Sequence, residues 1–161
     1  MRRQFRIGTF ETASSAVHSL VISKDGMRPS NLPVNKSGVI HVPLTYIGKD
    51  EIVYGTQLEK LTFLLTMLWC SRMYDHYGCT YQSKQDLYED YKFECIRDAV
   101  CSYSGAKDIK VDLPKNVEVG CDHQIANDLV YGDLPYVDIY SEESIQEFVF
   151  NDYISVMTGC D

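Results

Sequence analysis

A long apolar segment in the first half of the chain limits what this sequence can fold into. Between residues 56 and 77, leucines recur at helical spacing (Leu58, Leu61, Leu65 and Leu68), and other apolar side chains fill the remaining faces. A helix that is apolar on nearly all sides has to be surrounded by other elements. The sequence therefore predicts a buried helix at the centre of the molecule.

A second helix is predicted for residues 84–103. Ser83 suits its N-cap, and Asp86 in the first turn suits the helix dipole. Its apolar stripe recurs every fourth residue, at Leu87, Tyr91, Cys95 and Ala99. A third helix is predicted from Glu142 to about Phe150, with Ser141 as its N-cap.

Short segments of alternating or β-branched residues predict strands on both sides of these helices. They are residues 4–10, 39–46, 109–113, 117–120, 135–140 and 152–157. Strands flanking a helical middle predict an α+β fold, with a mostly antiparallel sheet, a buried central helix and a second amphipathic helix packed on one face. The 161 residues fit a single globular domain, residues 1–161.

The net charge of −8, from 23 acidic and 15 basic residues, disfavours direct binding to nucleic acid. An acidic surface suits a basic protein partner instead, although the same charge also serves ordinary solubility. The 12 tyrosines add side chains that are common in interfaces, and self-association stays open.

The six cysteines include no C-x-x-C pair, which argues against a structural zinc site. No secretory signal peptide is apparent, and no apolar run is long enough to cross a membrane. We therefore expect a cytoplasmic protein with reduced thiols and no membrane contact.

A polar segment near the start of the chain is the first candidate site. Within residues 9–20 it carries a carboxylate, a histidine and hydroxyls that suit phosphate, ribose or sugar oxygens. Histidine also titrates near neutral pH, so it can serve as a general acid or base. A local turn in which the hydroxyls bond to the backbone is the structural alternative. The residues are Glu11, Thr12, Ser14, Ser15, His18 and Ser19.

Asp122, His123 and Gln124 form the second candidate, directly after a predicted strand. If His123 and His18 converge, two histidines with nearby hydroxyls allow acid–base chemistry at a phosphate. Together with Glu11 and Asp122, the two histidines would instead suit a divalent metal. We favour a site with neither metal nor cofactor. The catalytic candidates are therefore His18, Glu11, His123 and Asp122, with Thr12, Ser14, Ser15, Ser19 and Gln124 as ligand-binding residues.

Three common enzyme signatures do not occur: the G-x-S-x-G elbow, the P-loop and the G-x-G-x-x-G fingerprint. Their absence argues against an α/β-hydrolase, a P-loop kinase and a Rossmann dehydrogenase.

Residues 8–20, with Phe10-Glu11-Thr12 and His18-Ser19, resemble the opening of a group of uncharacterised proteins from bacteriophages and Gram-positive bacteria. That opening reads Phe-Glu-Thr-Asn-Ser-Ser-Ser-Thr-His-Ser, and the blocks at 122–124, 148–151 and 158–161 resemble later parts of the same proteins. The resemblance implies a phage or mobile-element setting but carries no activity over. Apolar residues (Ala13, Ala16 and Val17) stand where the pattern is polar. If the pattern is catalytic in the group, the resemblance implies that this chain has lost the activity and kept a binding role.

Three functions are consistent with these observations. The first is binding or processing of a nucleotide-like or phosphorylated ligand at the Glu/Ser/His residues. The second is a non-enzymatic, acidic anti-defence protein that inhibits a host nucleic-acid-handling or immune enzyme by direct binding. The third is a structural or assembly role.

Overall fold

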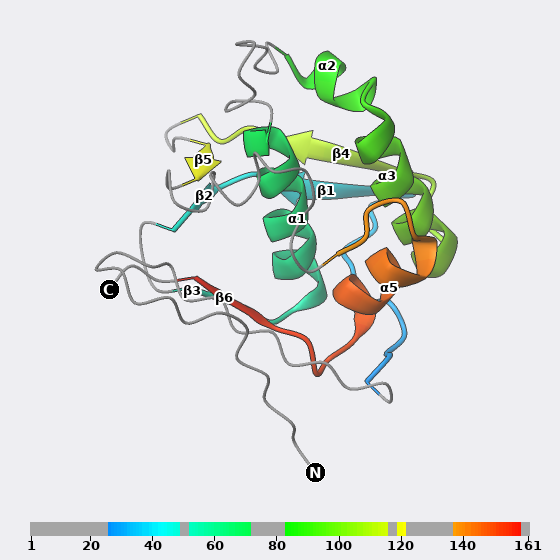
Figure 1. The fold of residues 1–161 in the computed structure, drawn as a ribbon. Coiled ribbons are helices and arrows are strands. Elements are labelled where there is room, and N and C mark those ends of the chain that lie inside the picture. The colour runs from blue at the N-terminus through cyan, green and yellow to red at the C-terminus, as the bar shows by residue number, and fades with distance from the viewer. Residues whose placement is uncertain (1–25, 49–51, 72–82, 116–118, 122–136, 159–161) are drawn as a thin grey trace, which may run out of the picture.

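The computed structural model describes residues 26–48, 52–71, 83–115, 119–121 and 137–158. Helix α1 (Gln57–Ser71) runs through the middle of these residues, and Figure 1 shows the other elements arranged around it. All but four of its fifteen residues are buried, which confirms the predicted central helix. Its start is held by Glu59, whose Oε2 accepts hydrogen bonds from the amides of Gly55 (3.1 Å) and Thr56 (2.9 Å).

The predicted second helix is two helices in the structure, α2 (Lys84–Tyr88) and α3 (Tyr91–Ser104). The second of these helices begins after Asp90, whose side chain accepts a hydrogen bond from the Lys92 amide at 2.8 Å and so caps α3. The break shifts the helical register, so the predicted apolar stripe is wrong at Tyr91, which is 66% exposed. Helix α3 ends at Gly105, in the left-handed region with φ 75°.

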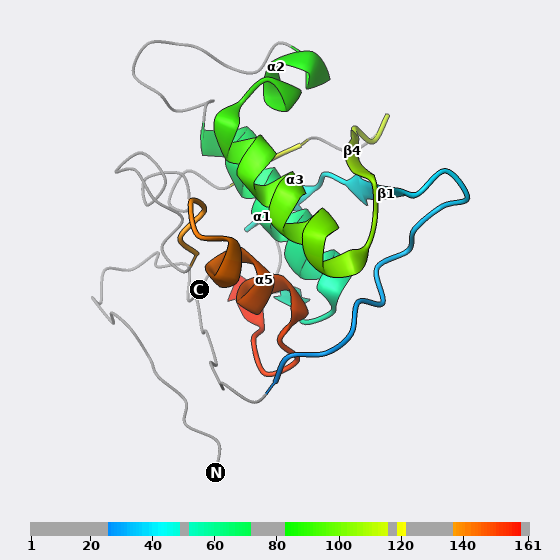
Figure 2. The ribbon, with the colours of Figure 1, turned by 90° about the vertical axis from the view of Figure 1, so that its right-hand side faces the viewer.

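Helix α5 (Glu142–Phe150) begins at the predicted Ser141, whose hydroxyl accepts a hydrogen bond from the Ser144 amide at 3.2 Å. It packs beside α3, and Figure 2 shows both helices against α1. Residues 137–140, expected in a strand, form a turn instead. The Asp138 side chain accepts a hydrogen bond from the Tyr140 amide at 3.0 Å, which favours a turn over an extended chain.

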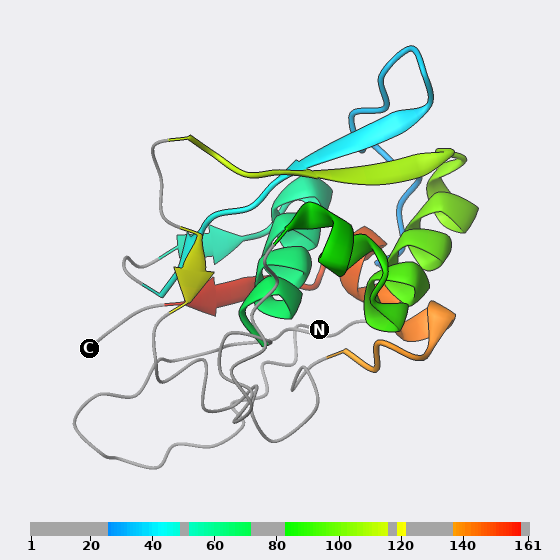
Figure 3. The same cartoon turned by 90° about the horizontal axis from the view of Figure 1, so that it is seen from above.

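The strands in the described part of the chain form three pairs (Figure 3), two parallel and one antiparallel. Strand β1 (Val39–Pro43) is parallel to β4 (Asp108–Asp112), and β2 (Tyr46–Ile47) is parallel to β5 (Gly120–Cys121). Strands β3 (Ile52–Tyr54) and β6 (Val156–Thr158) form the antiparallel pair.

The fold is therefore α+β as predicted, but the expectation of a mostly antiparallel sheet is wrong. Helices α1, α2 and α3 lie between β1 and β4 along the chain. A connection through helices brings the chain back to the same end of the preceding strand, so the two strands run in the same direction.

One hydrophobic core joins these layers. Helix α1 supplies its centre, with the inner faces of β1 and β4 on one side and the buried faces of α3 and α5 on another. None of the helices in the described residues is long and apolar enough to span a membrane.

Candidate functional site

The residues that the sequence predicted as a site lie outside the described part of the structure. They are Glu11, Thr12, Ser14, Ser15, His18, Ser19, Asp122, His123 and Gln124. The nearest described residue is Cys121, the last residue of β5, which is buried in contact with α1. The convergence of His18 and His123 therefore stays a prediction.

Among the described residues there is one histidine, His41 of β1. Its Nδ1 lies 3.2 Å from Oδ2 of Asp112, the residue at the end of β4. Both side chains are about half exposed, and the pair spans the two parallel strands on their solvent face. We interpret it as a surface contact of small energetic effect.

The four cysteines within the described ranges are free thiols: Cys70, Cys95, Cys101 and Cys121. The Cys70 thiol donates a hydrogen bond to the Cys121 sulfur, and this bond and burial together raise the pKa of Cys70, so this thiol is not a nucleophile at neutral pH. No group of three or more His, Cys, Asp or Glu side chains in these ranges could hold a metal ion.

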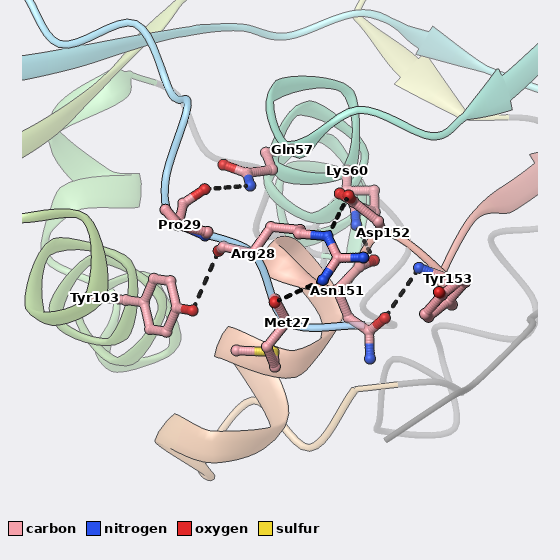
Figure 4. A network of polar contacts seen from close by, with 9 residues as sticks. All are labelled: Met27, Arg28, Pro29, Gln57, Lys60, Tyr103, Asn151, Asp152 and Tyr153. Atoms are coloured by element: carbon pink, nitrogen blue, oxygen red, sulfur yellow. Dashed lines mark hydrogen bonds and ion pairs between the residues drawn. The ribbon is translucent and has the colours of Figure 1, made fainter. Parts of the chain in front are cut away.

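A polar network surrounds the chain that precedes β1 (Figure 4). Gln57 Nε2 donates to the Pro29 carbonyl at 3.1 Å, and the Tyr103 hydroxyl donates to the Arg28 carbonyl at 3.1 Å. The Arg28 guanidinium also pairs with Asp152 at 3.1 Å. The network ties this chain to α1, α3 and the end of α5.

Lys60 lies at the centre of the same network and is fully buried. Its Nζ donates to the Asn151 carbonyl oxygen at 2.7 Å. Burial lowers the pKa of Lys60 to about 8, although the carboxylate of Asp152 opposes the shift. A lysine with a lowered pKa suggests chemistry, but this one has no access to solvent. We therefore assign Lys60 a structural role.

A hollow between α3 and the turn before α5 has the features of a binding surface. We call it the acidic tyrosine hollow, and it encloses about 370 Å³. Tyr91 and Tyr140 stack in it with ring centres 6.2 Å apart and ring planes at 24°. Their exposed fractions, 66% and 58%, show that the hollow opens to solvent. Its residues are Tyr91, Glu94, Cys95, Asp98, Ala99, Tyr140 and Glu142.

Both tyrosines are positioned by the caps of their helices. Tyr91 is the first residue of α3 and follows the capping residue Asp90. Tyr140 directly precedes Ser141, the cap of α5, in the turn that Asp138 stabilises. The two helices are joined beside the hollow because Gln146 Nε2 donates to the Ala99 carbonyl at 3.0 Å.

Three carboxylates give the hollow its charge. Arg97 offsets part of it, since one guanidinium nitrogen lies 2.9 Å from Asp98 and 3.4 Å from Glu94. Glu142 accepts a hydrogen bond only from the uncharged Gln146 amide, at 2.9 Å, among the contacts the described residues give it. The surroundings therefore favour a cation.

Sequence reasoning missed this hollow for two reasons. The sequence pattern places Tyr91 in a continuous apolar stripe and Tyr140 in a strand. The sequence features that indicate the positions of both tyrosines are Asp90 and Ser141, because each is a residue type that suits a helix N-cap. Comparison with family models, with curated proteins and with solved structures gave no match at any point of the chain.

Proposed function

We propose that this protein acts in the cytoplasm as a binding protein without enzymatic activity, and that its acidic tyrosine hollow receives arginine or lysine side chains of a basic protein partner. The observation that carries the proposal is the stacked and exposed pair Tyr91–Tyr140 among three carboxylates. Free thiols at all four described cysteines are consistent with a reducing compartment.

Two exposed rings that stack on each other contribute little to the core. Tyrosine is enriched in protein interfaces, where its ring packs and its hydroxyl remains available for hydrogen bonds. A guanidinium can stack on such a ring while it pairs with a carboxylate, a combination that lysine reproduces less well. We therefore expect arginine to be preferred over lysine.

The overall charge of −8 supports the same class of partner. It repels nucleic acid and steers a basic surface towards the protein, most strongly at low salt. A partner that normally holds nucleic acid has the required charge, which agrees with the inhibitor role expected from the sequence. The phage setting and the action against host defence rest on the resemblance alone and stay predictions.

The test is a binding titration with a fluorescein-labelled peptide of twelve alternating arginine and glycine residues, followed by fluorescence anisotropy. We expect Tyr91→Ala combined with Tyr140→Ala to weaken binding about tenfold, because two cation–π contacts are lost. We expect Glu142→Gln to weaken it about threefold. The matching lysine–glycine peptide should bind more weakly to the wild-type protein.

Glu143→Gln is the matched control, because Glu143 is the exposed neighbour of Glu142 on α5 and does not line the hollow. It removes the same charge, so it should have a smaller effect. Equal losses for the two variants, or an unchanged affinity after both tyrosine substitutions, would show that the peptide responds only to net charge.

Binding of a nucleotide-like or phosphorylated ligand is a separate proposal, supported by the polar composition of residues 9–20 and 122–124. Mass spectrometry of small molecules released from the purified protein tests it. A released ligand should be lost when Glu11 and His18 are both replaced by alanine. A structural role would instead require self-association of the purified chain.

A further inference from the structure

The three carboxylates of the acidic tyrosine hollow differ in what they contact. Glu142 forms no ion pair with a side chain of the described residues, so it is open to a cation from a partner. Glu94 and Asp98 lie one helical turn apart on α3, and both are paired with Arg97 of the same helix. The hollow therefore has one open carboxylate and two that a cation of the protein itself already occupies.

Arg97 is held by three contacts at the rim of the hollow. Its Nε and Nη2 atoms lie 3.0 Å and 2.9 Å from Oδ1 of Asp98, and Nη2 also lies 3.4 Å from Oε1 of Glu94. Arg97 is not one of the residues that line the hollow, so its guanidinium reaches the two carboxylates from the neighbouring face of α3. It takes the position that a guanidinium of a partner would need on the same two carboxylates.

The ion pairs of Arg97 are exposed and can be exchanged. The exposed fractions of the side chains are 31% for Arg97, 52% for Glu94 and 65% for Asp98, so water screens both pairs. Partial burial lowers the pKa of Arg97, but the neighbouring carboxylates together raise it, and one of these is Asp108 at the start of β4. Asp108 remains near the guanidinium if it leaves the hollow. Displacement of Arg97 therefore exchanges one surface ion pair for another and costs little.

We infer that Arg97 is an internal competitor for the acidic tyrosine hollow, and that it occupies Glu94 and Asp98 until an arginine of the basic partner takes its place. This inference rests on the proposed function and names how the same site is regulated. A ligand with one cation can pair with Glu142 and leave Arg97 in place. A partner with two arginines can fill both positions, so the competitor selects against ligands that carry a single positive charge.

The first test removes the competitor and measures binding of the fluorescein-labelled arginine–glycine peptide by anisotropy. Arg97→Gln should tighten binding about fivefold, because two carboxylates are released. Lys92→Gln is the matched control, because Lys92 lies on the same helix, does not line the hollow and forms no ion pair within the described residues. It removes the same charge and should tighten binding about twofold or less, since only the long-range field changes. Equal gains for the two variants would overturn the inference.

A double-mutant cycle separates competition from net charge. Both carboxylates that Arg97 occupies are removed in a background that carries Glu94→Gln and Asp98→Asn. In this background Arg97→Gln and Lys92→Gln should give equal gains in affinity, because the competitor has nothing left to occupy. Thermal unfolding shows that each variant is folded. A gain from Arg97→Gln that stays larger than the gain from Lys92→Gln would contradict the competitor role.

The displacement can also be observed at the Nε–H group of Arg97, which donates to Asp98 in the free protein. In ¹⁵N-labelled protein its signal is identified by its loss in Arg97→Gln, and the unlabelled peptide contributes no signal. We expect this signal to shift as the peptide saturates the protein, and an unchanged signal at saturation would refute the inference alone. If Tyr91→Ala combined with Tyr140→Ala leaves the affinity unchanged, the proposed function fails and the inference fails with it.

Discussion

At the scale of single residues, Lys60 is a polar side chain buried in the core, whereas Tyr91 and Tyr140 are exposed and accessible to a partner. Lys60 donates to the Asn151 carbonyl inside the core, where no partner molecule reaches it. Tyr91 and Tyr140 are exposed and stack on each other. The lowered pKa of Lys60 therefore affects the stability of the fold, whereas the exposed tyrosine rings are available to contact a partner.

We predict that Lys60 makes the stability of the protein depend on pH. Its pKa falls from 10.5 to about 8 in the folded state, so the unfolded chain binds more protons between those two values. Stability should rise as the pH increases from about 8 to about 10.5, and below pH 8 the buried charge destabilises the fold by about 3 kcal/mol. Lys60→Met should remove this dependence and increase the free energy of unfolding at pH 7 by about 1–3 kcal/mol.

Urea unfolding of Lys60→Met and wild type at pH 7, 9 and 10 measures the effect. The Asn151 carbonyl keeps a hydrogen bond from the Ile154 amide at 3.1 Å, so the substitution leaves it paired. Lys110→Met, on the exposed face of β4, is the control and should not change the pH profile. A constant stability difference between Lys60→Met and wild type from pH 7 to pH 10 would rule out this role for Lys60.

At the scale of elements, local sequence pattern predicted the helices α1 and α5. Helix α1 follows from its own apolar surface, and α5 follows from Ser141 and the acidic residues after it. The pairing of β1 with β4 was missed because it depends on how the intervening helices pack. The break at Asp90 was not predicted because the four-residue spacing of the apolar stripe continues from Leu87 to Tyr91.

The cap at Asp90 can be tested directly. Its side chain accepts a hydrogen bond from the Lys92 amide at 2.8 Å and fixes the start of α3, and with it the position of Tyr91. Asp90→Ala should lower the free energy of unfolding by about 1 kcal/mol, measured by urea denaturation. Asp98→Ala, which removes an exposed carboxylate from the middle of the same helix, should lower it by about 0.5 kcal/mol or less. Comparable losses for the two variants would contradict the assigned cap.

At the scale of the whole molecule, the described elements pack around α1, and the acidic tyrosine hollow lies between α3 and the turn before α5. The polar residues at 9–20 and 122–124, which composition alone singled out, lie outside the described residues. Sequence reasoning therefore anticipated the acidic character and the tyrosines, but not where the fold brings them together.

The most direct test of the central proposal is a map of where an arginine-rich peptide contacts the protein. Two-dimensional ¹H–¹⁵N NMR of the labelled protein during titration with the arginine–glycine peptide gives that map. The account predicts that shift changes concentrate at residues 91–99 and 138–142, with the backbone amides of Tyr91 and Tyr140 among the most affected. Shift changes spread evenly over the acidic surface, or centred on other residues while these two tyrosines stay unchanged, would contradict it.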